Sequence, residues 1–266
     1  MDIKPTVHKG CNSSAAIVPG TMIHSTSEAV FGVALTCLSC LGFQLLAKTV
    51  ECSLTPTSAK HCPWRWKNIL VSFIHAFLSS FGALCCFYEN PAMAEDLIFT
   101  HTVFSHALIS FSVGYFLSDS IDMVKNNLWS SLDLLAHHFV IVTCFGIAII
   151  TQHYVGYAVV ALIVEINSIF LHLRQLFQVL KVPRDSLRYR INSLVNLGTY
   201  MLCRIALLAW MTRWIVINRD QIPFSMYTIG SIGLAIMTVM NIVLFYRLLH
   251  SDFLRGSKNI TKGKDD

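Results

Sequence analysis

Residues 134–150 read LLAHHFVIVTCFGIAII, and this stretch decides the fold class. As a helix it nearly crosses a bilayer, because about 20 apolar residues at 1.5 Å each match a hydrocarbon core of about 30 Å. Two adjacent histidines, His137 and His138, lie near its start. Ionisable side chains at membrane depth are costly and usually functional, so the stretch predicts a membrane helix that carries a polar site.

Six further apolar blocks of similar length accompany it along the chain. We expect seven spans, at residues 29–47, 69–88, 102–124, 134–150, 155–173, 194–217 and 226–249. Charged residues make up only 13% of the 266 residues, about half the usual share of a soluble domain. Blocks this long satisfy their own backbone hydrogen bonds only as helices. The sequence therefore predicts an all-α multi-pass membrane protein.

Basic residues gather on one side of this predicted topology. Of the 20 Lys and Arg, all but five fall in the loops after the first, third and fifth spans and in the C-terminal tail. Only Arg204 lies well inside a span. Cytosolic loops carry the excess of Lys and Arg in membrane proteins. We therefore expect the N terminus outside or in a lumen and the C terminus in the cytosol.

Both tails carry short motifs. Asn12 begins a glycosylation sequon in the polar N-terminal 28 residues, and a second sequon begins at Asn259 on the predicted cytosolic side. The last five residues, KGKDD, resemble a retrieval signal for the endoplasmic reticulum.

No basic stripe interleaved with aromatic residues follows the pattern of a nucleic-acid-binding surface, and the spacing of the nine cysteines indicates no zinc site.

Polar side chains within the spans are the candidate site. We expect Asp119 and Asp122, at the end of the third span, to lie at the depth of the His pair on the next, antiparallel span. Asp133 is one helical turn from His137 and could pair with it. Further candidates for a cavity or for contacts between helices are His75, Glu165, Asn196 and Arg204. We expect Glu165 and Arg204 to approach each other, since both fall near mid-membrane.

Three interpretations of the His pair remain open on these residues alone. One histidine could act as a general base or acyl acceptor tuned by Asp119 or Asp122. The cluster could bind a metal. It could also serve only as a hydrogen-bonded contact between helices.

Residues 63–253 carry a resemblance to a known family. The segments that carry it include WRWKNILVSFIH at 64–75, SVGYF at 112–116, the His137–His138 pair, LIVE at 162–165, YRIN at 189–192 and LLHSDF at 248–253. On these segments the chain resembles the TLC domain, shared by TRAM proteins and ceramide synthases. It is most similar to the TLC-domain proteins that regulate membrane fluidity and phospholipid composition.

The resemblance implies four segments: a polar tail (1–28), an extra membrane helix (29–47), a six-helix TLC bundle (63–253) and a basic tail (254–266). It implies a cavity for acyl chains and, in ceramide synthases, a His pair that serves N-acylation with acyl-CoA. Those enzymes continue with a His-Asp and a further Asp, whereas this chain has Glu165, Ile166 and Asn167 there. The implied function is therefore regulation of phospholipid acyl composition, which limits polyunsaturated chains in phospholipids such as phosphatidylethanolamine.

Two alternative functions stay open. The first is an acyl-CoA-dependent acyltransferase that uses His137 or His138, with acyl-CoA as co-substrate and no other cofactor or metal. The second is a carrier or chaperone for lipid or membrane-protein cargo. The expected partners are phospholipids or fatty acyl chains. The resemblance implies the plasma membrane, and the tail motif gives the endoplasmic reticulum as the alternative.

Overall fold

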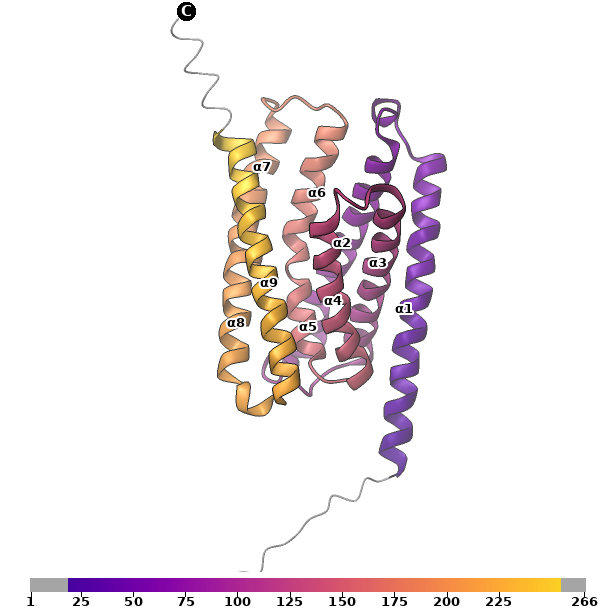
Figure 1. The fold of residues 1–266 in the computed structure, drawn as a ribbon, viewed down its shortest axis with the longest axis vertical. Helices are drawn as coiled ribbons and strands as arrows, with labels where there is room; N and C mark the ends of the chain where they lie inside the picture. Colours follow the sequence, from indigo (N-terminus) through magenta and orange to yellow (C-terminus); the bar gives the residue numbers. More distant parts are fainter. Residues whose placement is uncertain (1–18, 255–266) are drawn as a thin grey trace, which may run out of the picture.

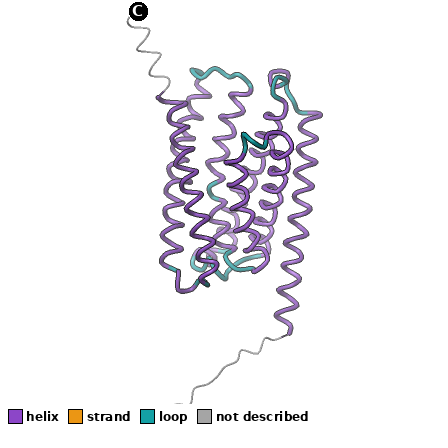
Figure 2. Tube along the Cα trace, in the orientation of Figure 1, coloured by secondary structure: helices purple, strands orange, loops and turns teal. Residues whose placement is uncertain are grey.

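The computed structural model describes the backbone of residues 19–254 and the side chains of residues 26–252. Asn12, Asn259 and the KGKDD tail lie outside the described residues. The described part consists of helices joined by loops and has no strand (Figure 2). It contains seven helical stretches that are long and apolar enough to cross a membrane, which confirms the predicted all-α multi-pass fold. The helices run roughly side by side as one bundle (Figure 1).

The bounds of the elements follow the chain in order. They are α1 (Pro19–Ser53), α2 (Pro63–Glu89), α3 (Val103–Asn127), α4 (Leu132–Thr151), α5 (Val155–Leu162), α6 (Glu165–Val179), α7 (Leu187–Tyr200), a π-helical turn η3 (Met201–Ala206), α8 (Leu207–Ile217), α9 (Phe224–Leu249) and a second π-helical turn η5 (His250–Leu254). Short 3₁₀ turns, η1 (Thr57–Ala59), η2 (Pro91–Ala94) and η4 (Arg219–Gln221), lie in the connections.

The starts of three helices follow from local sequence. Pro63 occupies the first turn of α2 and Pro223 directly precedes α9, where a missing N–H costs nothing. Thr102 accepts a hydrogen bond from the Ser105 N–H, and Ser105 accepts one from the Thr102 N–H. This reciprocal capping box fixes the start of α3.

Two of the seven spans are interrupted. The fifth changes from α5 to α6 at Ile163–Val164, where the N–H groups bond three residues back instead of four. The sixth passes from α7 through η3 to α8. Neither interruption contains proline, and π-helical turns often mark functional positions. Both interruptions lie beside the cavity described below.

Helix α1 packs along the bundle through small residues. The Thr36 hydroxyl donates to the Ser110 carbonyl at 3.3 Å, and the Ser39 hydroxyl donates to the Phe111 carbonyl at 2.7 Å. A Cβ on Gly114 would lie 2.6 Å from the Thr36 carbonyl oxygen. Small residues allow such close approach between membrane helices, so α1 is an integral member of the bundle.

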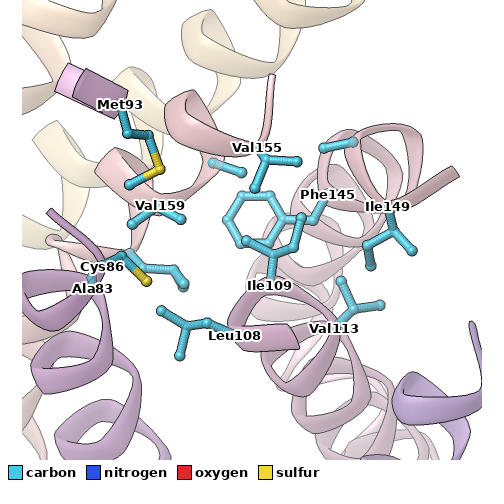
Figure 3. Packing of buried hydrophobic residues seen from close by; sticks show 13 residues of the cluster. Ala83, Cys86, Met93, Leu108, Ile109, Val113, Phe145, Ile149, Val155 and Val159 are labelled. Atoms are coloured by element: carbon cyan, nitrogen blue, oxygen red, sulfur yellow. The ribbon is translucent and has the colours of Figure 1, made fainter. Parts of the chain in front are cut away.

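The largest apolar cluster lies between α2, α3, α4 and α5. Figure 3 shows the Phe145 ring between Val155 and Ile109, with Met93 and Val159 beside it. We call the end of the bundle where α1 ends and α2 begins the basic end, because Lys67 lies there. This cluster lies away from that end, and Phe145 also forms part of the cavity wall.

Candidate functional site

A cavity of about 160 Å³ lies between α4, α5, α8 and α9. That volume is roughly tenfold larger than a space for one water molecule. Most of its wall is apolar, and this part reaches Trp214, Ile222 and Met226 at the end opposite the basic end. Apolar cavities tend to exclude water and accept apolar ligands. The lining therefore suits a hydrocarbon chain.

The three strongly polar side chains on this cavity are His137, Glu165 and Arg204. His137 comes from α4, Glu165 from the first turn of α6 and Arg204 from the π-helical turn η3. The interruption before α6 and the π turn thus each place one charged residue at the cavity. The other lining residues with polar side-chain groups are Tyr154, Tyr157, Trp214 and Cys144.

The two adjacent histidines face different surroundings. His137 lines the cavity, whereas His138 is buried against α3. The His138 Nδ1 lies 3.3 Å from the Ser120 hydroxyl and 3.8 Å from Asp119 Oδ2. Neighbouring residues on a helix point about 100° apart, so one histidine can face the cavity and the other the core.

Asp119 and Asp122 lie in a polar cluster between α2 and α3. Asn68 donates to Asp119 Oδ1. Lys67 donates to Asp122 Oδ1 at 2.9 Å, and the Trp64 indole N–H donates to Asp122 Oδ2 at 2.8 Å. Asp119 is brought to His138, as the sequence predicts for this depth, but Asp122 is held by other partners. Neither carboxylate lines the cavity.

His75 is stacked inside the bundle and does not reach the cavity. Its ring lies parallel to that of Tyr115, with centroids 3.9 Å apart, and Phe43 and Phe116 pack edge-on against it. The Nε2 atom has no hydrogen-bond partner. The sequence gives no sign of this aromatic surrounding, because its members come from three different helices.

Arg204 is 7% exposed and ties three elements together. Its Nε donates to Asn167 Oδ1 at 2.7 Å, its Nη1 to Asn241 Oδ1 at 2.9 Å and its Nη2 to the Ser168 hydroxyl at 2.8 Å. Asn167 in turn donates to the carbonyl and side-chain oxygens of Asn196. Asn196 is thereby placed in a contact between helices rather than at the cavity.

Two expected pairings have a different outcome. Glu165 and Arg204 line the same cavity, but no ion pair within 4 Å joins them among residues 26–252. Asp133 does not pair with His137. Instead it is exposed and lies 3.6 Å from Arg247 of α9, a helix that packs against α4.

One buried ion pair was not expected from the sequence. Arg174 of α6 donates through Nε to Asp252 Oδ2 at 2.6 Å and through Nη2 to Asp252 Oδ1 and the Ser251 hydroxyl. The Ser193 hydroxyl also binds Asp252. Arg174 lies one residue beyond the predicted fifth span (155–173), and in the structure it belongs to α6. Its partner lies 78 residues away in the sequence, where no local pattern indicates it.

Local hydrogen bonds shift the pKa of Asp96, which lies in the turn between α2 and α3. Partial burial would raise the pKa of Asp96, but hydrogen bonds from the backbone N–H groups of Phe99 and Ile98 outweigh it and hold that pKa below its usual value. Asp96 thus organises the turn between α2 and α3 and lies apart from the cavity.

Comparison with known proteins decides the family. The sequence model of the TLC domain, described for TRAM, LAG1 and CLN8, matches residues 65–250. The chain belongs to the TLC-domain family. TLC domain-containing protein 2 of Danio rerio is 55% identical over 213 residues, which cover 79% of this chain and 86% of that protein.

Human relatives lie at lower identity. Human TLC domain-containing protein 2 is 40% identical over 203 residues, 76% of each chain. Human TLC domain-containing protein 1 is 35% identical over 191 residues, 71% of this chain and 76% of that protein. The TLC match begins at residue 65 and therefore leaves α1 outside it. His137, Glu165 and Arg204 all fall within the matched TLC region.

Proposed function

We propose that this protein regulates the acyl composition of membrane phospholipids by holding acyl chains in the cavity between α4, α5, α8 and α9. The outcome would be less incorporation of polyunsaturated chains into phospholipids such as phosphatidylethanolamine. The single observation that carries the proposal is the distribution of polarity in the cavity. Charged side chains are confined to one end, and the rest of the wall is mainly apolar.

That distribution matches an amphiphile with one chain. Transfer of a methylene group from water to an apolar site contributes about 0.8 kcal/mol, so a long chain would favour the apolar part strongly. A polar head would then lie near His137, Glu165 and Arg204. Occupancy by particular chains would determine which chains remain available to phospholipid synthesis.

An acyl-CoA-dependent acyltransferase is the second candidate, and one observation favours it. His137 lines the cavity, so its imidazole lies where the carbonyl end of a bound acyl chain would be. In an acyltransferase of this kind, His137 would contact the acyl group. His138 and Asp119 would lie behind His137, away from the cavity. Acyl transfer from labelled acyl-CoA to an amine or lysophospholipid by the purified protein distinguishes the two candidates.

We also propose that the N terminus lies outside and that the basic end faces the cytosol, at the plasma membrane. The distribution of Lys and Arg supports this orientation. The division into an N-terminal tail, an extra helix, a TLC bundle and a C-terminal tail likewise stays a proposal. A glycosylation reporter placed at each terminus would test the orientation.

Lipid profiling with a cavity-filling variant tests the main proposal. In cells that lack the protein, wild type should restore the acyl profile, and Ala161→Phe should not, because Ala161 lines the cavity. Ala235→Phe is the matched control, since Ala235 is on the exposed outer surface of α9. Equal restoration by Ala161→Phe, at matched expression, would exclude the cavity as the working site.

A further inference from the structure

Two arginines are buried among residues 26–252, and they differ in one respect. Arg174 binds the carboxylate of Asp252. Arg204 is buried to a similar degree, but its three hydrogen-bond partners are two amide oxygens and a hydroxyl, all neutral. Among residues 26–252, no carboxylate lies within 4 Å of Arg204. Glu165 acts on Arg204 only through a longer-range charge interaction. A buried cation that no carboxylate contacts directly is unfavourable, so an anion that binds Arg204 directly would be stabilised.

Counting donors shows what kind of partner fits. A guanidinium has five N–H groups, one on Nε and two on each Nη. The bonds to Asn167, Asn241 and Ser168 use one group on each nitrogen. One N–H therefore remains on Nη1 and one on Nη2. A carboxylate has two oxygens, one for each of these N–H groups.

The residues around Arg204 indicate the chemical class of the ligand. Arg204 lines the cavity together with His137 and Glu165, and no lysine or second arginine lines it. A phosphate would present three oxygens and up to two charges to a single cation. A carboxylate presents one charge and two oxygens. Beyond this polar end, the apolar wall continues to Trp214 and Met226.

We propose that the cavity binds an unesterified long-chain fatty acid, with its carboxylate on the two remaining N–H groups of Arg204. The hydrocarbon chain lies between α4, α8 and α9 and points toward Trp214. This inference rests on the proposed acyl-chain function and names its ligand class. The rigid attachment of Arg204 to three other residues positions the two donors before the ligand arrives, which reduces the cost of binding.

Glu165 provides a second test of the proposal, in which a substitution should strengthen binding of the fatty acid. It lines the same cavity as Arg204, so its negative charge would repel a bound carboxylate. Replacing it with glutamine removes the charge and keeps the shape. A fatty acid should therefore bind Glu165→Gln more tightly than wild type, whereas a fatty alcohol should bind both equally.

The experiment compares ligands first and variants second. Purified full-length protein in detergent at pH 8 is titrated with labelled oleic acid, oleyl alcohol and methyl oleate, and binding that Ala161→Phe abolishes is counted as cavity binding. We expect the acid to bind at least about tenfold more tightly than the alcohol or ester, the difference typical of a charge-assisted pair. Arg204→Lys keeps a cation but loses the paired donors, and should remove most of this preference.

The outcomes separate the two proposals. Equal binding of acid and alcohol by wild type would overturn the carboxylate inference and leave the acyl-chain cavity intact. No cavity binding of any of the three ligands would overturn both. Arg213→Lys is the control for the arginine variant, because Arg213 is exposed and does not line the cavity. The comparison of ligands on wild type stands even where Arg204→Lys fails to fold.

Discussion

Asp119 Oδ2 lies 3.8 Å from His138 Nδ1, across the contact between α3 and α4. Asn68 of α2 binds the other oxygen of the same carboxylate. One buried side chain thus links three helices. It does so behind the cavity rather than within it.

Removal of this carboxylate should destabilise the bundle. Asp119→Ala leaves Asn68 and His138 without that partner, which typically costs about 1–3 kcal/mol per buried group. We expect a clear fall in the midpoint of thermal unfolding in detergent. Asp133→Ala, an exposed acid on α4, should change the midpoint little. A fall of equal size in both variants would contradict the assigned role.

His75 should tolerate a change that His138 does not. The unpaired Nε2 of His75 lies among aromatic rings, so His75→Phe removes an unsatisfied buried group and retains a stacked ring. The thermal midpoint should stay constant or rise. His138→Phe should lower it by removing the contacts to Ser120 and Asp119, worth about 1–3 kcal/mol. A loss of stability in His75→Phe would show that Nε2 has a partner in the membrane.

Gly114 should be the most sensitive glycine of the α1 contact. A Cβ there meets the Thr36 backbone oxygen at 2.6 Å and the Ser39 Cβ at 2.5 Å. Gly114→Ala therefore requires α1 to move, at a cost of about 1–3 kcal/mol. Gly146→Ala is the matched control, since a Cβ at Gly146 has no neighbour within 4 Å. Chemical denaturation of both variants would measure the difference.

The Arg174–Asp252 pair should contribute more than any exposed pair. Breaking a buried pair by removing one partner costs about 3–5 kcal/mol, so Arg174→Ala should reduce the yield of folded protein sharply. Arg219→Ala removes an exposed arginine next to Asp220, where a pair is worth about 0–1 kcal/mol. Similar yields for the two variants would show that the Asp252 carboxylate finds another partner.

The lowered pKa of Asp96 predicts that the stability of the fold depends on pH in the acid range. Its pKa is held below the unfolded value of about 3.9, so the folded state favours the charged form. The stabilisation is present above the unfolded pKa and is lost as pH falls through the lower, folded pKa. Wild type should lose more stability than Asp96→Asn between about pH 5 and pH 2. Parallel pH curves for the two proteins would contradict the assignment.

The sequence predicts the seven spans because each apolar block is long, and helix α3 begins directly after the predicted Thr102 boundary. The break at Ile163–Val164 contains neither proline nor glycine, so no local signal predicts it. The neutral partners of Arg204 come from α6 and α9, and only the folded bundle brings them together. Helical periodicity alone predicts that His137 and His138 face different surroundings, since adjacent residues of a helix cannot share one face.

The contact between α1 and α3 has a consequence for where this protein can be cut. The family match starts at residue 65, yet the surface of α3 that carries Gly114 is shaped to receive Ser39 and Thr36 from outside that match. A fragment that begins at the family boundary would turn this surface, and the buried His106, toward lipid. Expression of that fragment should therefore yield a bundle that recruits another helix to the surface around Gly114, so the family boundary at residue 65 is a poor place to truncate this chain.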